Sequence, residues 1–339
     1  MKTTKILSNH SYMKAQNPLF YLSRAQQSRR FSFFNPDRTS RLLDRRLAGL
    51  GHLIKDEYAN IRDSYLKPKH PIVLAHGLLG FDELRIAKRA LPAIHYWRGI
   101  KDAYSINGVE VITAPVSPSA SIEQRAEQLL QGIENRAEGR KVNIIADFVL
   151  SGLDARYMIS KLRPTTFEVV SLTTIATPHQ GSAVADYILE WLGEERLSQL
   201  YFILGRLGLE NGAFKQLTRK YLAHTFNPDV VNVDSVKYYS YGAVLSPDTW
   251  SMFSQSRRIL DNEEGPNDGL VSVASSKWGC YKGTLVDVSH IDLINWTNRL
   301  KWFAAEITGN RKKFNAVALY LDIAGKPFSG RPWLRMIEV

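Results

Sequence analysis

The stretch that decides the fold is KVNIIADFVLSGLDARYM, residues 141–158. Its first half is short, apolar and rich in β-branched side chains, which predicts a buried strand over 142–149. From Gly152 to about Leu162 the apolar positions recur with helical spacing, which predicts an amphipathic helix. The chain therefore turns from a buried strand into a helix within a few residues.

The same alternation of short strands and amphipathic helices extends in both directions from this stretch. Further strands are predicted over 71–75, 109–113, 169–175 and 238–243. Ser121 and Gln124 have the spacing of a capping box, so a helix is expected to begin there. This pattern predicts the α/β fold class, with a mainly parallel sheet covered by helices on both faces.

Three other regions flank or interrupt this domain, which we place at residues 70–324. Residues 37–69 are a predicted helical extension, because apolar residues recur at three- and four-residue steps over about 40–66. That helix is expected to pack against the core rather than lie on a membrane. Residues 183–234 are rich in leucine and aromatic side chains, which predicts a helical cap. The cap is either a lid that opens at a lipid surface or a static cover. Residues 325–339 form a divergent C-terminal tail.

The net charge of +11 is unevenly distributed along the chain. Residues 1–36 hold six Lys or Arg residues and no Asp or Glu, so the remainder of the chain carries +5. A basic, serine-containing segment without acids resembles a mitochondrial targeting segment, with a disordered basic arm as the alternative. No recognition motif accompanies the charge, which argues against nucleic-acid binding. The single cysteine, Cys280, excludes an internal disulfide, and no apolar run reaches the roughly 18 residues of a transmembrane helix.

A glycine-containing loop, HGLLG at 76–80, follows the strand predicted over 71–75. Its two glycines let the backbone turn tightly, so that a main-chain N–H can point at an oxygen on which negative charge develops. Leu78 is the candidate donor of such an oxyanion hole, through its main-chain amide.

Two later loops supply a candidate acid and a candidate base. Asp268 lies in the turn EGPNDGLVS at 264–272, and His290 follows a predicted strand within VDVSHIDL at 286–293. A serine nucleophile needs a histidine to take its proton and a carboxylate to fix that histidine. Each residue alone is more typical of a turn or a structural group. Ser151 is the hydroxyl nearest to the strand-to-helix turn, and it precedes both in the order nucleophile, acid, base.

Five motifs occur in a fixed order along the chain. They are AHGLLG at 75–80, GLDARYM at 152–158, ATPHQGS at 176–182, NDGLVS at 267–272 and SHIDLINW at 289–296. Together they resemble the fungal mitochondrial-type triacylglycerol lipases, a group of α/β-hydrolases similar to bacterial true lipases. The resemblance covers about residues 70–323 and implies carboxylic ester hydrolysis through an acyl-enzyme. By this match Asp268 is the acid, His290 is the base and Leu78 is an oxyanion donor.

The resemblance also bears on cofactors. In the bacterial relatives an aspartate two residues after the histidine binds a structural calcium, and Asp292 stands at that position. No second ligand is evident from the sequence, and the expected chemistry requires no cofactor.

The turn after the central strand departs from the family pattern. The family has an elbow like HSMGGLD, whereas this chain has DFVLS at 147–151 before its GLD, one residue longer and without Gly-x-Ser-x-Gly. Counted from the strand, the nucleophile position holds Phe148, and counted back from the helix it holds Val149. Neither side chain can attack a carbonyl, and Ser151 is expected a turn late, at the start of the helix.

Three interpretations of this departure stay open at the level of sequence. The first is a misassigned exon boundary in the gene model. The second is a true product that has lost its nucleophile but keeps the fold and an acyl-binding cleft. The third is a Ser151 that works with altered geometry.

The sequence as a whole predicts a lipase-type carboxylic ester hydrolase that acts on triacylglycerol or related acyl esters. We expect it to associate peripherally with a lipid or membrane surface and to reside in mitochondria. The alternative is a catalytically inactive lipid-binding or interaction protein built on the same fold.

Overall fold

A computed structural model describes residues 49–76, 83–84, 94–95, 97, 99–117, 120–147, 149–191, 193, 212–246, 253–295 and 314–325. The chain divides into two compact units, Met1–Leu43 and Asp44–Val339. All described residues belong to the second unit, so the predicted basic segment at 1–36 and the tail from 326 onward lie outside them.

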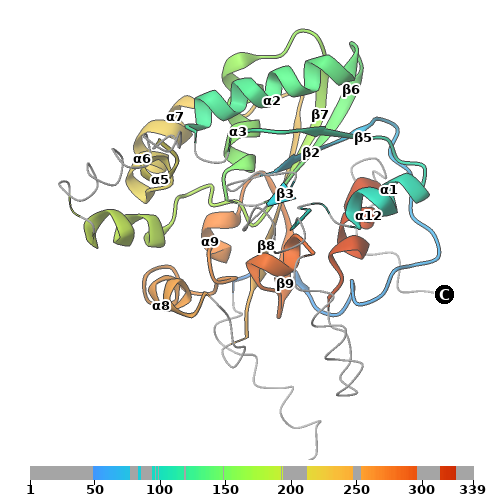
Figure 1. Cartoon of the computed structure of the whole chain (residues 1–339). Coiled ribbons are helices and arrows are strands. Elements are labelled where there is room, and N and C mark those ends of the chain that lie inside the picture. The colour runs from blue at the N-terminus through green and yellow to red at the C-terminus, as the bar shows by residue number, and fades with distance from the viewer. Residues whose placement is uncertain are drawn as a thin grey trace, which may run out of the picture. The chain divides into compact units, whose positions relative to one another are not determined.

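A seven-stranded parallel sheet forms the centre of the second unit (Figure 1). Its strands lie in the order β1-β9-β8-β7-β6-β2-β5. In chain order they are β1 (Leu53–Ile54), β2 (Ile72–His76), β5 (Val111–Ala114), β6 (Lys141–Asp147), β7 (Glu168–Ile175), β8 (Lys237–Val244) and β9 (Cys280–Val286). A separate antiparallel pair joins β3 (Glu83–Leu84) to β4 (Ile94–His95). The predicted α/β class with a mainly parallel sheet is confirmed.

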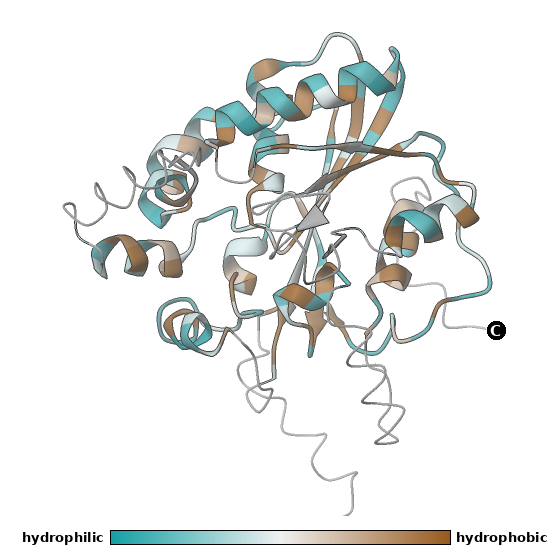
Figure 2. Ribbon diagram, viewed as in Figure 1, coloured by the Kyte–Doolittle hydropathy of each residue, from teal (hydrophilic) through white to brown (hydrophobic). Residues whose placement is uncertain are grey.

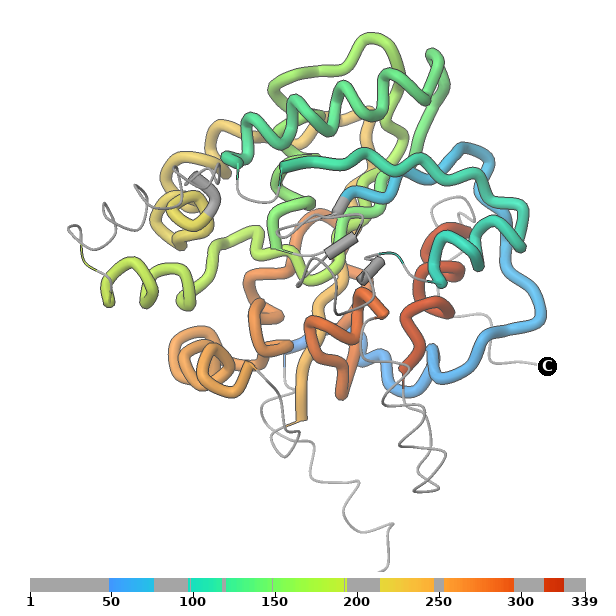
Figure 3. Tube along the Cα trace, viewed as in Figure 1, coloured from blue at the N-terminus to red at the C-terminus, as the bar shows by residue number. Residues whose placement is uncertain are grey.

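Helices cover both faces of the sheet, as the alternation of apolar residues in the strands requires. In β2, Val73 and Ala75 pack with α2 (Ile122–Ala137) and α3 (Ser151–Tyr157). The intervening residues Ile72 and Leu74 point to the other face. There they pack with α1 (Ile100–Ile106) and α12 (Ala316–Gly325), which lie side by side (Figure 3). Figure 2 shows apolar strands in the centre and mixed polar and apolar colouring along α2, as expected of a helix with one buried face.

The described part of the predicted cap, residues 183–191, 193 and 212–234, is mainly helical, although residues 230–234 are not. A helix over 183–191 begins eight residues after the end of β7. The later part contains α5 (Gly212–Gln216), α6 (Arg219–Tyr221), the π-helical turn η3 (Leu222–Phe226) and α7 (Asn227–Asp229). Leu217, Leu222 and Phe226 pack in one cluster with Leu150 and Leu153 at the start of α3. The described part of the cap is therefore anchored on the strand-to-helix turn.

The remaining helical segments follow β6, β8 and β9 along the chain. They are the second π-helical turn η2 (Met158–Leu162), which continues α3, and α8 (Ser254–Glu263), α9 (Val273–Ser276) and α10 (His290–Leu293). Within the described part of the chain, no helix is both long and apolar enough to span a bilayer.

The predicted helix over 40–66 is wrong for its described part, residues 49–66, which contain no helix. Gly49, Gly51 and Asp56 have φ values of 81°, 74° and 60°, in the left-handed region that interrupts a right-handed helix. Between them, Leu53–Ile54 pairs in parallel with β9 as an edge strand. Of the apolar residues at helical spacing, Leu50, Ile54 and Tyr58 are buried, whereas Ile61 is 53% exposed. Ile54 and Tyr58 pack in one cluster with residues of the sheet and α12. Pairing with the sheet edge thus satisfies backbone groups that a helix would have paired internally.

Candidate active site

The carboxyl ends of parallel strands meet at one edge of a sheet, and in open α/β sheets ligands bind there. Asp147 ends β6, and the loop that carries Asp268 is joined to the end of β8 because Leu245 N–H donates to the carbonyl of Asn267 at 2.9 Å. His290 opens α10 four residues after the end of β9. The fold therefore gathers the predicted acid and base at this edge, although they are 22 positions apart in sequence.

The structure joins Asp268 and His290 directly. The Nδ1 of His290 lies 2.7 Å from Oδ2 of Asp268, and both side chains are fully buried. The other carboxylate oxygen, Oδ1, accepts the main-chain N–H groups of Leu270 and Val271 at 2.9 and 2.8 Å. The main chains meet as well, because His290 N–H donates to the carbonyl of Asp268 at 3.0 Å. The carboxylate is thus fixed from two sides and can hold the imidazole in one orientation.

Opposing effects act on the pKa of the His290 imidazole. Burial lowers it, because desolvation disfavours the charged form. The charge of Asp268, its hydrogen bond to the ring and the charge of Asp147 together outweigh burial, so the pKa is raised above its ordinary value. A bond from Nδ1–H to Asp268 leaves Nε2 as the basic nitrogen of the neutral ring. This arrangement suits a general base that becomes charged during turnover and is stabilised in that form.

The strand-to-helix turn differs from a nucleophile elbow. Strand β6 ends at Asp147 rather than at the predicted residue 149, and α3 begins at Ser151, the expected place for this serine. Among the described residues of the turn, Asp147 and 149–151, none has a positive φ, and Phe148 lies outside the described residues. An elbow holds its nucleophile on a strained turn. Ser151 instead occupies the first turn of a helix.

The hydroxyl of Ser151 is buried, at 1% exposure, and donates to the main-chain carbonyl of Asp147 at 2.5 Å. A hydroxyl has one proton to donate. For Ser151 to act as a nucleophile, its hydroxyl must therefore turn away from the Asp147 carbonyl so that its proton can pass to the imidazole of His290.

Gly152 explains why helix α3 can lie so close to the sheet. A Cβ at this position would come within 2.4 Å of Oγ1 and 2.6 Å of Cγ2 of Thr177. Two residues further, Asp154 is buried with Arg125 of α2, whose Nε and Nη2 lie 2.9 and 2.8 Å from Oδ2. Burial raises the pKa of Asp154 to about 6, against the opposing charge and hydrogen bonds of Arg125. Within the motif GLDARYM, Gly152 and Asp154 therefore let α3 pack closely against the sheet and against α2.

Helix α3 also carries a buried guanidinium, that of Arg156, which sequence analysis left without a role. Arg156 Nη1 is 3.3 Å from Nδ1 of His179 and donates to Oδ1 of Asn227 at 3.0 Å, while its Cζ lies 3.5 Å from the ring centre of Trp278. Burial lowers the pKa of Arg156 to about 9, so it stays charged at neutral pH. Burial and this charge hold the pKa of His179 well below its usual range. His179 is therefore a neutral structural histidine and not a second base.

No sequence signal would have separated Arg156 from a surface arginine, because an arginine on an amphipathic helix is ordinarily expected to face water. Its partners come from three separate parts of the chain and are brought together only by the fold.

The two other predicted site residues have different outcomes. Leu78, the predicted oxyanion donor, lies outside the described residues. Asp292 is the N3 residue of a capping box, where its Oδ2 accepts from the main-chain N–H of Ser289 at 3.0 Å and from the Ser289 hydroxyl at 2.5 Å. The described residues contain no group of three His, Cys, Asp or Glu side chains that could hold a metal ion. Asp292 thus caps α10 beside His290.

A parallel α/β sheet with a buried histidine–aspartate pair at its carboxyl edge defines the α/β-hydrolase class. Among solved structures, Bacillus licheniformis lipase BlEst2 in its mature form has a TM-score of 0.52 at 19% identity, covering 73% of this chain and 96% of that chain. Staphylococcus hyicus lipase has a TM-score of 0.52 at 18% identity, covering 74% of this chain and 98% of that chain. These likenesses confirm the fold.

Sequence relatives establish the family. Triacylglycerol lipase 2 of Saccharomyces cerevisiae is 34% identical over 322 residues, covering 79% of this chain and 95% of the yeast protein. Triacylglycerol lipase of Vibrio cholerae is 29% identical over 279 residues, covering 70% of this chain and 83% of the bacterial protein. No protein-family model matches the chain. The chain belongs to the triacylglycerol lipase family.

Proposed function

We propose that this lipase-type ester hydrolase acts on triacylglycerol or related acyl esters, with His290 as base, Asp268 as acid and Ser151 as nucleophile. The observation that carries the proposal is the fully buried Asp268–His290 pair, with its 2.7 Å contact, at the carboxyl edge of the sheet. Relatives that share its family are named triacylglycerol lipases, which supports catalysis over the alternative of an inactive lipid-binding protein.

The proposed reaction has two halves. In the first, Nε2 of His290 takes the Ser151 proton as the oxygen attacks the acyl carbon, and the same proton then leaves with the alcohol. In the second, His290 takes a proton from water, whose oxygen attacks the acyl-serine, and returns it to Ser151 as the carboxylic acid departs. Asp268 stays ionised and stabilises the imidazolium that forms in each half. No step requires a cofactor.

Turnover of a soluble short-chain ester tests this assignment. His290→Ala and Asp268→Asn are each expected to lower kcat by roughly 10⁴- to 10⁶-fold, because each removes part of a triad acting as a unit. His224→Ala is the control, because His224 is exposed on the cap and takes no part in the proposed chemistry. Equal turnover in all three variants and the unmodified protein would remove Asp268 and His290 from the mechanism.

We also propose that the cap contacts a lipid surface. Tyr187 and Trp191 are 50% and 67% exposed, and they lie four residues apart on the helix over 183–191, hence on one face. Exposed aromatic side chains are enriched where a protein meets a lipid interface. Replacing both by serine is expected to weaken adsorption to a triacylglycerol emulsion and to leave turnover of a soluble ester unchanged. Ile106→Ser, at an 85% exposed position on α1, is the matched control. An equal loss of adsorption in the control and in the double variant would contradict a lipid-binding face formed by Tyr187 and Trp191.

A mitochondrial location is a further proposal, supported by the six basic and no acidic residues in 1–36. A fusion of residues 1–36 to a fluorescent protein is expected to enter mitochondria. A diffuse signal from this fusion would contradict the proposal.

A further inference from the structure

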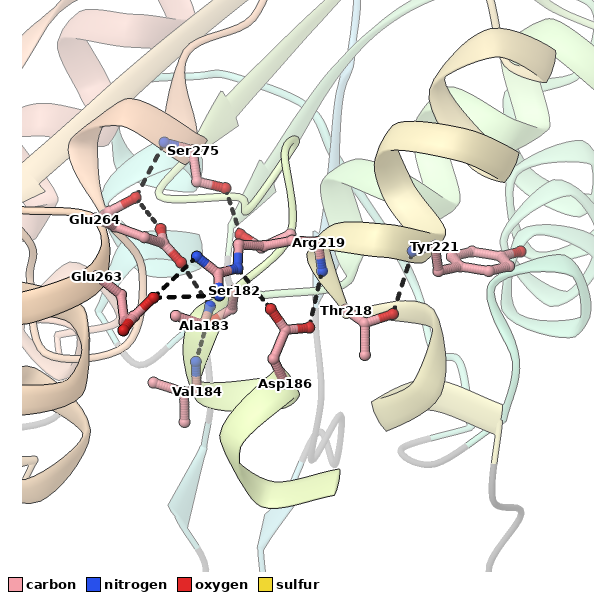
Figure 4. A network of polar contacts seen from close by, with 12 residues as sticks. Ser182, Ala183, Val184, Asp186, Thr218, Arg219, Tyr221, Glu263, Glu264 and Ser275 are labelled. Atoms are coloured by element: carbon pink, nitrogen blue, oxygen red, sulfur yellow. Dashed lines mark hydrogen bonds and ion pairs between the residues drawn. The ribbon is translucent and has the colours of Figure 1, made fainter. Parts of the chain in front are cut away.

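The loop that carries Asp268 and the entrance to the cap meet in a continuous network of polar contacts, shown in Figure 4. The loop runs from Glu264 to Ser272, and the cap entrance consists of residues 181–186. Nothing in the hydrolytic steps requires these two segments to touch. Among the hydrogen bonds of the described residues, Glu264 joins the two segments directly, and Ser275, which follows the loop, also donates its hydroxyl to the carbonyl of Gly181 at 2.6 Å.

Glu264 is half-buried and uses both carboxylate oxygens. Oε1 accepts the main-chain N–H of Ala183 at 2.5 Å, and Oε2 accepts the hydroxyl of Ser272. Ala183 is the first residue of the cap helix over 183–191, and both it and Ser272 are buried. Hydrogen bonds to an ionised carboxylate are stronger than those between neutral groups, so Glu264 links Ala183 and Ser272 by two strong hydrogen bonds.

From Ser272 the connection reaches Asp268 through the backbone of the loop. Ser272 pairs with Asn267 in an isolated antiparallel bridge, and Asp268 N–H donates to the carbonyl of Val271 at 3.1 Å. The Ser272 hydroxyl also accepts the main-chain N–H of Ser275 at 3.1 Å, which caps α9. Displacement of Ser272 would therefore move the turn that aims Asp268 at His290.

On its other side, the cap entrance is fixed to α6. Ser182 N–H donates to the carbonyl of Leu217 at 2.9 Å. The main-chain N–H and the Nε of Arg219 both donate to the carboxylate of Asp186, at 3.1 and 2.5 Å. Gly181 lies so close to this segment that a Cβ there would come within 2.5 Å of the Cα of Arg219. The entrance and α6 thus move together.

We propose that Glu264 is a positioning residue that couples the cap to the catalytic carboxylate, holding Asp268 in contact with His290. The catalytic consequence rests on the proposed function, but the geometric coupling does not. A movement of the cap that pulled Ala183 away from Glu264 would loosen the turn that holds Asp268. The position of the cap would therefore influence the pKa of His290.

The adjacent residue provides a matched control. Glu263 is exposed and contacts only Nη1 and Nη2 of Arg219 among the hydrogen bonds described, at 3.4 Å each. It carries the same charge one position away, but none of these bonds reaches the Asp268 loop. Glu264→Ala and Glu263→Ala therefore separate positioning from local charge.

The first readout is the pKa of His290, measured by NMR titration of histidine-labelled full-length protein, which needs no turnover. Glu264→Ala is expected to lower this pKa, because a loosened Asp268 stabilises the imidazolium less while burial still opposes it. Glu263→Ala is expected to leave it unchanged. Glu264→Gln keeps an acceptor for Ala183 and is expected to retain most of the unmodified behaviour.

The second readout is ester turnover. Glu264→Ala is expected to lose roughly tenfold or more in kcat with little change in KM, since a misplacement of about 1 Å can cost up to about 100-fold. If the ester is not hydrolysed by any form, the proposed function fails, while a lowered His290 pKa in Glu264→Ala alone still supports the coupling.

Two outcomes would overturn the inference. One is an unchanged His290 pKa in Glu264→Ala protein whose melting curve shows a folded state. The other is an equal fall of that pKa in Glu263→Ala, which would assign the effect to charge rather than to position.

Discussion

At the scale of single residues, the acid–base pair could be predicted from the sequence, whereas its supports could not. Asp268 lies in a predicted turn and His290 follows a predicted strand, in the expected chain order, and the structure joins them at 2.7 Å. The two backbone donors to Asp268 and the bridge by Glu264 depend on the loop conformation, which no residue pattern specifies. Ser151 was expected at the start of the helix, and the structure places it there.

Asp147 provides a residue-scale prediction about pH. Its charge raises the pKa of His290, and His290 can take a proton only when neutral, so turnover should rise as pH passes upward through that pKa. Asp147→Asn removes the charge and is expected to move the acid limb of kcat/KM to lower pH. The pH profile on a soluble ester checks this. A limb that stays in place, or that moves to higher pH, would contradict the assigned influence of Asp147.

At the scale of elements, the strand and helix around the central turn could be predicted because their periodicities are clear. The boundary could not be placed, since Phe148 and Val149 are as apolar and strand-compatible as the residues before them. The helix predicted over 40–66 was wrong, in its described part, for a different reason. Its apolar spacing is helical, but left-handed positions at Gly49, Gly51 and Asp56 exclude the helix.

Gly152→Ala is predicted to destabilise the protein although alanine favours a helix. The added methyl would come within 2.4 Å of Thr177 Oγ1, so we expect a loss of about 1–3 kcal/mol in the free energy of unfolding in urea. Adding Thr177→Ala removes both of the nearest atoms and is expected to restore part of the loss. A single variant as stable as the original protein would disprove this tight docking of α3.

Arg125→Met tests the buried pair between α2 and α3. It leaves the carboxylate of Asp154, at 1% exposure, without its cation, and removing one partner of a buried pair costs about 3–5 kcal/mol. The pKa of Asp154 is already raised in the folded state, so its charged form opposes folding as pH rises through about 6. Without the cation, the loss in unfolding free energy should therefore be larger at pH 8 than at pH 5.

Arg140→Met is the control, because Arg140 forms an exposed ion pair with Glu110. Such pairs contribute less than about 1 kcal/mol. Equal losses in Arg125→Met and Arg140→Met would contradict a special role for the buried pair.

At the scale of the second unit, the parallel sheet could be predicted from the alternation of strands and helices. The edge strand β1 could not be predicted. Strand β1 has two residues, too few for any periodicity, and it pairs with the last strand of the sheet. The same segment contacts α12 near the other end of the described chain, where Tyr58 donates its hydroxyl proton to Asp322 at 2.7 Å. Contacts of such long sequence separation leave no local signal.

Tyr58→Phe tests this long-range contact. It removes the hydroxyl donor to Asp322, which is only 6% exposed, and the lost hydrogen bond to a charged group is expected to cost about 1.5–3 kcal/mol of unfolding free energy. Tyr65→Phe removes only a part-exposed hydroxyl that accepts from Arg62 N–H at 2.9 Å, so a smaller effect is expected. Urea denaturation of both variants checks the contact, and an equal effect would show that α12 does not depend on Tyr58.

The most direct test of the catalytic account is the reaction of the folded full-length protein with a fluorophosphonate, followed by mass spectrometry of the labelled peptide. We expect the label on Ser151, and we expect it to vanish in His290→Ala, because the serine reacts only when the imidazole takes its proton. A folded protein that takes no label, or a label on another serine, would contradict Ser151 as the nucleophile of this lipase.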